Sequence, residues 1–237
     1  MSPATITSAV LDVVDDWSQP LLTHYDHASG ERTELSAATL GNWAAKSANF
    51  FVDELGLGAG DEILVDLPEH WQTAAILLGA WWAGTRVHLS DVDHGSLQAV
   101  VTSADRIDHH GDVDEVLVAS LDPFAMGVRD LPAGITDFAT AVRVHGDQYR
   151  PGPAPTGPVL DDATTDEVVR DAAAAAGAGI SAGARVVTTR GWHTAADVTA
   201  NLLAPLIAGA SLVTVAHADD TRLDALAATE RATVVLR

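Results

Sequence analysis

Apolar residues recur at helical spacing in the stretch that follows Ser36. They are Leu40, Trp43, Ala44, Phe50 and Phe51. This spacing places one apolar stripe along a helix. Ser36 precedes the stripe as an N-cap, because its hydroxyl can accept from the backbone N–H groups of the first turn. Gly56 follows the stripe and can adopt the left-handed conformation that ends a helix. The pattern predicts a helix from Ser36 to about Leu55.

A strand–helix–strand unit comes next. Residues 63–67 form a short apolar run that Pro68 ends, and residues 71–82 are apolar on nearly every side, as in a buried helix. Gly84 stops that helix, and residues 86–89 read as the following strand. This order is typical of a parallel sheet with helices on its faces.

The pattern weakens after residue 91 and recovers beyond the segment PGPAPTGP at 151–158, which holds four prolines and reads as a linker. Short strands are predicted at 100–102 and 116–120. The elements predicted beyond the linker are a helix at about 164–176, a strand at 185–188, a helix at 194–207, a strand at 211–216, a helix at 220–228 and a strand at 233–236.

The second half of the chain echoes the first. GLGAGDEILVDLPEHW at 56–71 parallels GISAGARVVTTRGWHT at 179–194, and the Ala-Gly at 83–84 parallels that at 208–209. We therefore predict an α/β fold with parallel-rich sheets flanked by helices, in two related halves. The predicted organisation is a first half at 1–150, a linker at 151–158 and a second half at 159–237, which could pack with the first into one compact domain.

The charge balance narrows the range of partners. The 237 residues include 33 acidic and 13 basic ones, giving a formal net charge of −20. Such a surface repels phosphate backbones, so neither nucleic acid nor an anionic membrane is expected as a partner. The chain has no cysteine, which excludes disulfides and zinc–thiolate sites. No apolar run approaches about 18 residues and no secretory signal is visible, so a cytoplasmic location is expected.

A loop at 105–115 is rich in residues that bind metals. It contains the run Ile-Asp-His-His-Gly-Asp-Val-Asp-Glu at 107–115. One interpretation is a metal-dependent activity at this loop. The other is a solvated acidic loop, which acidic proteins contain without any metal.

Two segments resemble a known superfamily. Leu35-Ser36, Gly60-Asp61, Leu67-Pro68, Gly79 and Ala83-Gly84 fall in order along residues 34–91. Arg185-Val186, Trp192-His193, the run 203–206 and the run 208–210 follow in the second half. Together they resemble segments of adenylate-forming enzymes, the acyl-CoA synthetase and AMP-binding superfamily, and imply the fold of part of the N-terminal domain. The whole-chain pattern also resembles a small actinobacterial family of this length, a resemblance that implies no particular activity.

The stretch between these segments departs from the superfamily pattern. Adenylate-forming enzymes carry a Ser/Thr/Gly-rich phosphate loop there, ending in Pro-Lys-Gly, whereas this chain reads PAPTGPVLDD. It has no hydroxyl cluster and no lysine, and Asp161 and Asp162 would repel a triphosphate. The chain ends at Arg237, before the adenine-binding segments and the catalytic-lysine domain of the superfamily. The resemblance therefore implies a degenerate, truncated relative, for which we expect no catalytic residues and no cofactor.

The resemblance also points to pocket residues. Trp192 and His193 match an aromatic–histidine pair that lies near the acyl path in the superfamily, and His88 stands where the superfamily has proline. These three are the predicted ligand-pocket residues, and the other interpretation of His193 is a core or interface histidine that caps the end of a strand. The preferred hypothesis is a non-catalytic module that binds a small molecule or a protein, with a homodimer expected because truncation exposes surface. The alternative is a residual nucleotide or acyl-group enzyme that needs a partner subunit.

Overall fold

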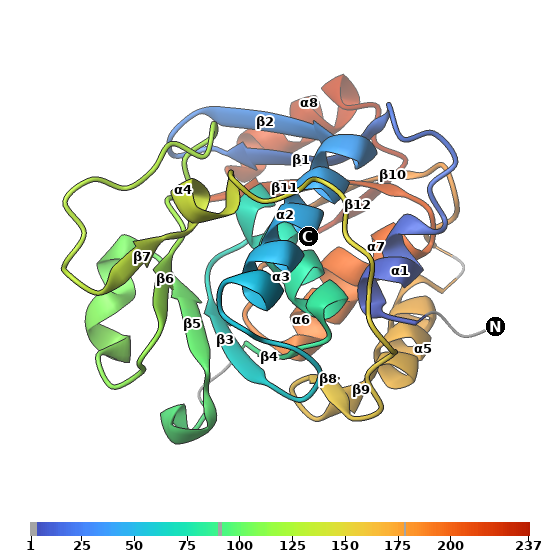
Figure 1. Ribbon diagram of the computed structural model, residues 1–237. Coiled ribbons are helices and arrows are strands. Elements are labelled where there is room, and N and C mark those ends of the chain that lie inside the picture. The colour runs from blue at the N-terminus through green and yellow to red at the C-terminus, as the bar shows by residue number, and fades with distance from the viewer. Residues whose placement is uncertain (1–3, 90–91, 178) are drawn as a thin grey trace.

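Two parallel-rich sheets organise the computed structural model, which describes residues 4–89, 92–177 and 179–237 (Figure 1). The first sheet has five strands within the described residues. In spatial order they are β12 (Val234–Leu236), β10 (Arg185–Thr188), β11 (Ser211–Ala216), β1 (Pro20–Asp26) and β2 (Glu31–Ser36). Neighbouring strands pair in parallel except β2, which returns antiparallel to β1.

The second sheet has seven strands in the same described ranges. In spatial order they are β7 (Ile135–Asp137), β6 (Val116–Val118), β5 (Ala99–Thr102), β3 (Glu62–Asp66), β4 (Arg86–His88), β8 (Pro158–Leu160) and β9 (Ala163–Thr164). Their pairings are parallel apart from the β8–β9 hairpin. The predicted α/β class with parallel-rich sheets is confirmed.

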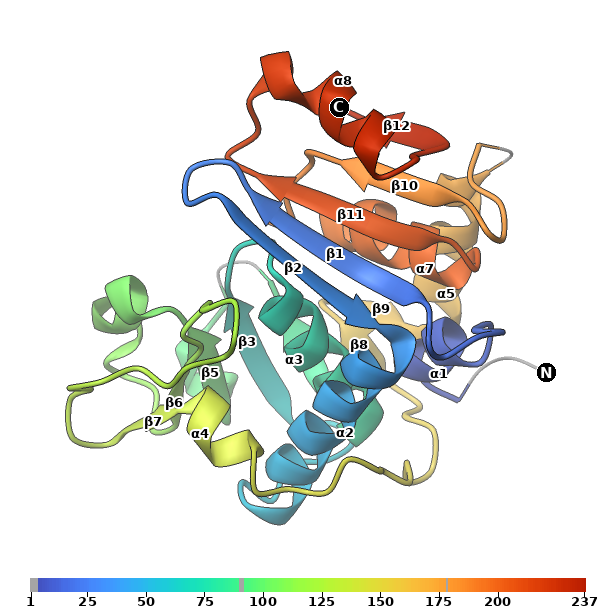
Figure 2. The ribbon, with the colours of Figure 1, turned by 90° about the horizontal axis from the view of Figure 1, so that it is seen from above.

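Helices fill the space between the sheets and cover their outer faces. They are α1 (Ile6–Leu11), α2 (Ala37–Asp53), α3 (Trp71–Ala83), α4 (Phe138–Val142), α5 (Thr165–Ala176), α6 (Ala195–Val198), the π turn η3 (Thr199–Leu203), α7 (Ala204–Ile207) and α8 (Asp220–Thr229), with 3₁₀ turns η1 (His94–Ser96) and η2 (Ala104–His110). Figure 2 shows α3 lying between β3 and the sheet of β1 and β11, with α8 on the far side of that sheet. Ser36 caps α2 as predicted, and Gly56 and Gly84 both have positive φ.

The alternation of side chains along the strands divides the core into three clusters. The largest lies between the sheets and joins Leu212 of β11 to Ile63 of β3 through the apolar faces of α2 and α3. On the outer face of the first sheet, Val213 packs with Leu223 of α8. On the outer face of the second, Val100 packs with Val113. Successive strand residues thus enter different layers, as the two-residue repeat of a strand requires.

Each sheet takes strands from both sides of the proline-rich segment. The hairpin β1–β2 joins the sheet of β10, β11 and β12, whereas β8 and β9 extend the sheet that β3 begins. The division at 151–158 into two halves stays a prediction, and the sheets themselves interleave across it.

Several described elements were not among those predicted from the sequence. They are α1, β1, β2, β7, β8 and β9. The strand β2 shows why such elements escape prediction. Its residues, ERTELS, are mostly polar and mostly not fully buried, so no apolar run marks the strand. No helix in the described part of the chain has the length and hydropathy needed to cross a membrane.

Candidate functional site

Three side chains converge near the carboxyl ends of β1 and β3, which belong to different sheets. His24 lies near the end of β1, Glu31 begins β2, and His70 follows β3 and caps α3. One ligand atom from each lies within 4.8 Å of the others, and within the described residues this is the one such group of three. Ligands of parallel α/β sheets bind outside the carboxyl ends of the strands, so this is the edge where a site is expected.

The three side chains are buried and held by neighbours. The exposed fraction is 2% for His24 and 4% for His70. Nδ1 of His24 lies 3.0 Å from the Thr214 hydroxyl, and the Thr33 hydroxyl donates to Glu31 at 2.7 Å. The imidazole planes of His24 and His70 meet edge to face, with ring centroids 4.7 Å apart.

The two ring nitrogens of His70 have different environments. Nδ1 accepts the backbone N–H of Gln72 at 3.1 Å and so caps α3. Nε2 faces Oε1 of Glu31 at 3.4 Å. That contact lacks the geometry of a hydrogen bond, and Nε2 is a buried atom without a hydrogen-bond partner among the described residues. Such atoms are uncommon and call for an explanation.

Burial controls the charge of this cluster. Desolvation, followed by the neighbouring imidazole of His70, lowers the pKa of His24 to about 4, and nearby carboxylates oppose this only in part. His24 is therefore neutral near pH 7. Desolvation alone would raise the pKa of Glu31, but the facing His70 and the Thr33 hydroxyl outweigh it and lower the pKa. Glu31 is therefore ionised.

The predicted pocket residue His88 lies in a different part of the molecule. It is 6% exposed at the end of β4, with Nε2 at 3.1 Å from Glu62 and Nδ1 at 3.5 Å from Asp161. Arg86 completes this network by binding Glu62 at 2.9 Å. Burial opposes ionisation of Glu62, but hydrogen bonds from Ser96 and His88 and the charge of Arg86 outweigh it and lower the pKa. His88 thus ties β4 to β3 and to the β8–β9 turn.

Trp192 and His193 follow β10 on the carboxyl side of the first sheet. Trp192 is 2% exposed and belongs to the largest core cluster, whereas His193 is exposed. None of the three main cavities formed by the described residues is lined by Trp192, His193 or His88. Their predicted roles in a ligand pocket stay predictions.

Two metal-type residues of the loop at 105–115 are paired with residues outside the loop. Nε2 of His110 lies 2.9 Å from Asp66, and Nδ1 of His94 lies 2.7 Å from Asp112. Arg106 also binds Asp66. In the described part of the chain, these residues do not form a group of three with converging ligand atoms. The alternative of a metal-dependent activity at this loop finds no support there.

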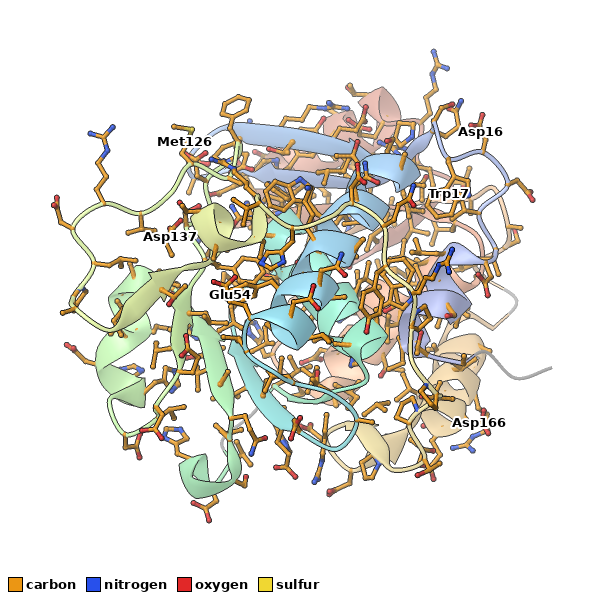
Figure 3. The ribbon with its side chains drawn as sticks, in the orientation of Figure 1. Asp16, Trp17, Glu54, Met126, Asp137 and Asp166 are labelled. Atoms are coloured by element: carbon orange, nitrogen blue, oxygen red, sulfur yellow. The ribbon has the colours of Figure 1, made fainter. Side chains whose placement is uncertain are left out.

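Three of the cavities formed by the described residues open to the surface. The first, of about 510 Å³, lies at the amino ends of β10 and β11 and is lined by apolar residues such as Leu21 and Leu206, with Asp16 and Arg185 at its polar side. The second, of about 640 Å³, is bordered by Trp17, Trp82 and Tyr149. Figure 3 shows Asp16 and Trp17 on the loop before β1. Cavities of this size can hold a small molecule.

The third cavity, of about 380 Å³, borders the stretch that stands in place of a phosphate loop. It is lined by Thr156, Gly157 and Arg86, among others. Asp161 occupies the turn of the β8–β9 hairpin with a φ of +44°, and its backbone carbonyl accepts from Nε of Arg86 at 2.7 Å. Asp162 accepts from the same guanidinium at 2.6 Å. The guanidinium group of Arg86, which contacts this turn, is thus already bound to protein oxygens.

Sequence reasoning missed His24, Glu31 and His70. One signal was present: the parallel between the halves aligns His70 with the predicted pocket residue His193. Nothing in the sequence joins His24 to His70, because β1 and β3 belong to different sheets. Their convergence follows from tertiary packing.

Solved structures of acyl-CoA synthetases have a similar fold. A Brucella canis acyl-CoA synthetase matches with a TM-score of 0.75 and 18% identity over 98% of this chain and 46% of its own. A Mycobacterium tuberculosis fatty acyl CoA synthetase matches with a TM-score of 0.73 and 15% identity over 98% and 49%. This chain therefore spans about half the length of those enzymes, and the likeness at these identities shows the fold: that of the N-terminal domain of AMP-binding enzymes.

The sequence itself gives a closer relationship. No family model matches the chain. A protein of Mycobacterium tuberculosis described as a "TIGR03089 family protein" is 45% identical over 245 residues, which cover 99% of each of the two chains. Because the identity runs along the whole of both sequences, the chain belongs to the TIGR03089 protein family.

Proposed function

We propose that this protein is a non-catalytic module that binds a small molecule or a protein through the fold of an AMP-binding domain. The observation that carries the proposal is the β8–β9 turn. Its two aspartates occupy the place of a phosphate loop, and Arg86 is engaged by Asp161 and Asp162. Catalysis of phosphoryl or adenylyl transfer relies on preorganised positive charge against developing negative charge. The two aspartates of the β8–β9 turn supply negative charge instead.

The position of the one lysine supports the same proposal. Lys46 lies on α2, and its ammonium donates to the backbone carbonyl of His145 at 2.6 Å. It therefore joins α2 to the loop after α4. A lysine that holds this loop is not available to bind a triphosphate at the β8–β9 turn.

The test is a calorimetric titration with ATP, AMP, CoA and a non-hydrolysable acyl-adenylate. An intact acyl-CoA synthetase in the same buffer is the positive control. We expect heat from the control and none from this protein with ATP or AMP. Micromolar binding of ATP or of the acyl-adenylate would overturn the proposal and favour the alternative, an enzyme that needs a partner subunit.

A homodimer is the form of protein binding that we propose first. Phe124 and Val144 are more than four-fifths exposed, at 83% and 84%, and Met126 is 56% exposed. Arg143 donates to the carbonyl of Ala125, which joins the loop of Phe124 and Met126 to the end of α4 that precedes Val144. Large exposed apolar side chains of this kind are typical of interfaces. Light scattering coupled to size exclusion should give twice the chain mass, and a monodisperse monomer would contradict a dimer.

A further inference from the structure

We propose that His24, Glu31 and His70 bind a divalent transition-metal ion of the zinc class, which ties the two sheets together. The site is independent of the proposed function, since it lies away from the β8–β9 turn and needs no nucleotide. Two imidazoles and one carboxylate form a ligand set that zinc accepts in proteins.

The geometry is close to that of a bound ion. Zinc with bonds of about 2.1 Å in a tetrahedral site separates its ligand atoms by roughly 3.4 Å. Nε2 of His70 and Oε1 of Glu31 already lie 3.4 Å apart. The three ligand atoms all lie within 4.8 Å of one another, so movements of at most about 1.4 Å bring them to the tetrahedral separation.

The residues around the cluster orient two of the ligands. The Thr214 hydroxyl stands beside Nδ1 of His24 at 3.0 Å and can accept its proton, which leaves the lone pair of the other ring nitrogen for a metal. The Thr33 hydroxyl donates to Oε1 of Glu31 and fixes the carboxylate. Metal-binding histidines in proteins have an outer partner of this kind, which sets the tautomer and the ring orientation.

His70 must change its tautomer when it binds the ion. Its Nδ1 accepts from the N–H of Gln72, so in the neutral ring the proton resides on the buried Nε2. Metal binding at Nε2 moves the proton to Nδ1 and ends the hydrogen bond to Gln72. The metal thus takes the place of the unpaired proton at Nε2, at the expense of the helix-cap hydrogen bond and with the new Nδ1–H turned toward the N–H of Gln72. Metal binding should therefore change the amide resonance of Gln72.

The ligands come from both layers of the molecule. His24 and Glu31 belong to the five-stranded sheet, and His70 lies in the short connection between β3 of the seven-stranded sheet and α3. An ion held by all three would cross-link the sheets at their carboxyl ends. Binding to the folded state alone raises the apparent stability of the protein.

The experiment is a titration of the full chain, with any histidine tag removed, with Co²⁺ and Zn²⁺. Glu31→Gln keeps the shape of the side chain and removes its charge. His70→Asn keeps a capping side chain at the start of α3 and removes the imidazole. His109→Asn is the matched control, because His109 is an exposed histidine outside the cluster.

We expect one ion per chain, with visible absorption from tetrahedral Co²⁺ that Zn²⁺ removes. Each of the two cluster variants should bind at least about tenfold more weakly, and His109→Asn should bind like the native chain. Zn²⁺ should also raise the melting temperature and shift the amide resonance of Gln72 in the native protein.

Either of two results overturns the proposal. One is the absence of stoichiometric binding by the native protein. The other is binding that both cluster variants retain unchanged, which would assign the ion to surface histidines. The resonance of Gln72 is measured on the native chain, so the proposal remains testable where a variant fails to fold.

Discussion

At the scale of single residues, Glu230 anchors the outer face of the five-stranded sheet. Its side chain is 6% exposed and binds the guanidinium groups of Arg32 and Arg185. The Tyr25 hydroxyl donates to the same carboxylate. Burial alone would raise the pKa of Glu230, but these hydrogen bonds and the charge of Arg185 outweigh it, and the pKa is lowered. The carboxylate therefore stabilises the fold only while it is ionised.

Replacing Glu230 by Gln should lower the free energy of unfolding near pH 7 by about 1–3 kcal/mol, because the guanidinium groups of Arg32 and Arg185 each lose one charged hydrogen-bond partner and keep only Glu34 among the described carboxylates. The pKa of Glu230 is lower in the folded state than in the unfolded one, so the folded state binds fewer protons in acid. The stabilisation is present above the unfolded pKa of about 4.3 and is lost as the pH falls through the folded pKa. The difference between the native protein and the variant in denaturant titrations should therefore shrink as the pH falls below about 4.3.

Glu54→Gln is the control for this comparison, since the side chain of Glu54 is 56% exposed. It should leave the free energy of unfolding within about 0.5 kcal/mol of the native value. A constant difference between Glu230→Gln and the native protein down to pH 3 would contradict the assignment of Glu230 as an ionised anchor.

Residue-level prediction of the site was limited by what a linear sequence can show. The resemblance to adenylate-forming enzymes predicted Trp192, His193 and His88 as pocket residues, because they occupy set positions in the segments that resemble that superfamily. His24 and Glu31 belong to no motif, and their meeting with His70 depends on how two sheets pack. Neither spacing nor composition contains that information.

At the scale of elements, the contact between α2 and α3 depends on one glycine. A Cβ added at Gly79 of α3 would lie 2.4 Å from Cβ of Ser47 and 2.9 Å from the carbonyl oxygen of Ala44, both on α2. The Ser47 hydroxyl binds the backbone of its own helix at Trp43 with a 2.8 Å hydrogen bond, so it has little freedom to move away. The absence of a side chain at Gly79 sets how closely the two helices approach.

Gly79→Ala should therefore destabilise the protein by about 1–3 kcal/mol, since overpacking forces the helices apart. Alanine favours a helix over glycine by about 1 kcal/mol, so a purely local effect would have the opposite sign. Gly111→Ala is the matched control, because Gly111 has a φ of −68° and open space around its Cβ position. Chemical denaturation of the three proteins decides the sign, and a stabilised Gly79→Ala would refute the packing argument.

The sequence predicted those elements whose apolar residues are dense and regular. The N-cap at Ser36, the helix α3 and the strands β3, β10 and β11 are as expected from periodicity. The helix predicted at 194–207 is observed as α6, a π turn and α7 in succession. The polar edge strand β2 and the three-residue strand β7 were missed, because their partly buried residues give no period to detect.

At the scale of the whole molecule, the net charge of −20 places like charges near one another over most of the surface. Self-repulsion of this kind destabilises the compact state, and salt screens it over a distance of about 10 Å at 0.1 M. Raising KCl from about 0.01 to 1 M should therefore raise the melting temperature measured by calorimetry. NaCl should act equally, since the effect is screening. A melting temperature that falls with salt would show that ion pairs such as Arg86–Glu62 outweigh the repulsion.

The pairing of β1 with β11 also constrains the order in which the protein can mature on the ribosome. His24 and Thr214, which contact each other across this pair, are 190 residues apart. At about 5–20 residues per second, the N-terminal hairpin waits roughly 10–40 s for its parallel neighbour to be synthesised. Through that interval one edge of β1 has no strand beside it, and an open edge is a template for aggregation. The charged residues Glu31, Arg32 and Glu34 on β2 keep the waiting hairpin polar on its other edge. We therefore expect the nascent chain to be a substrate for chaperones until its last quarter has emerged.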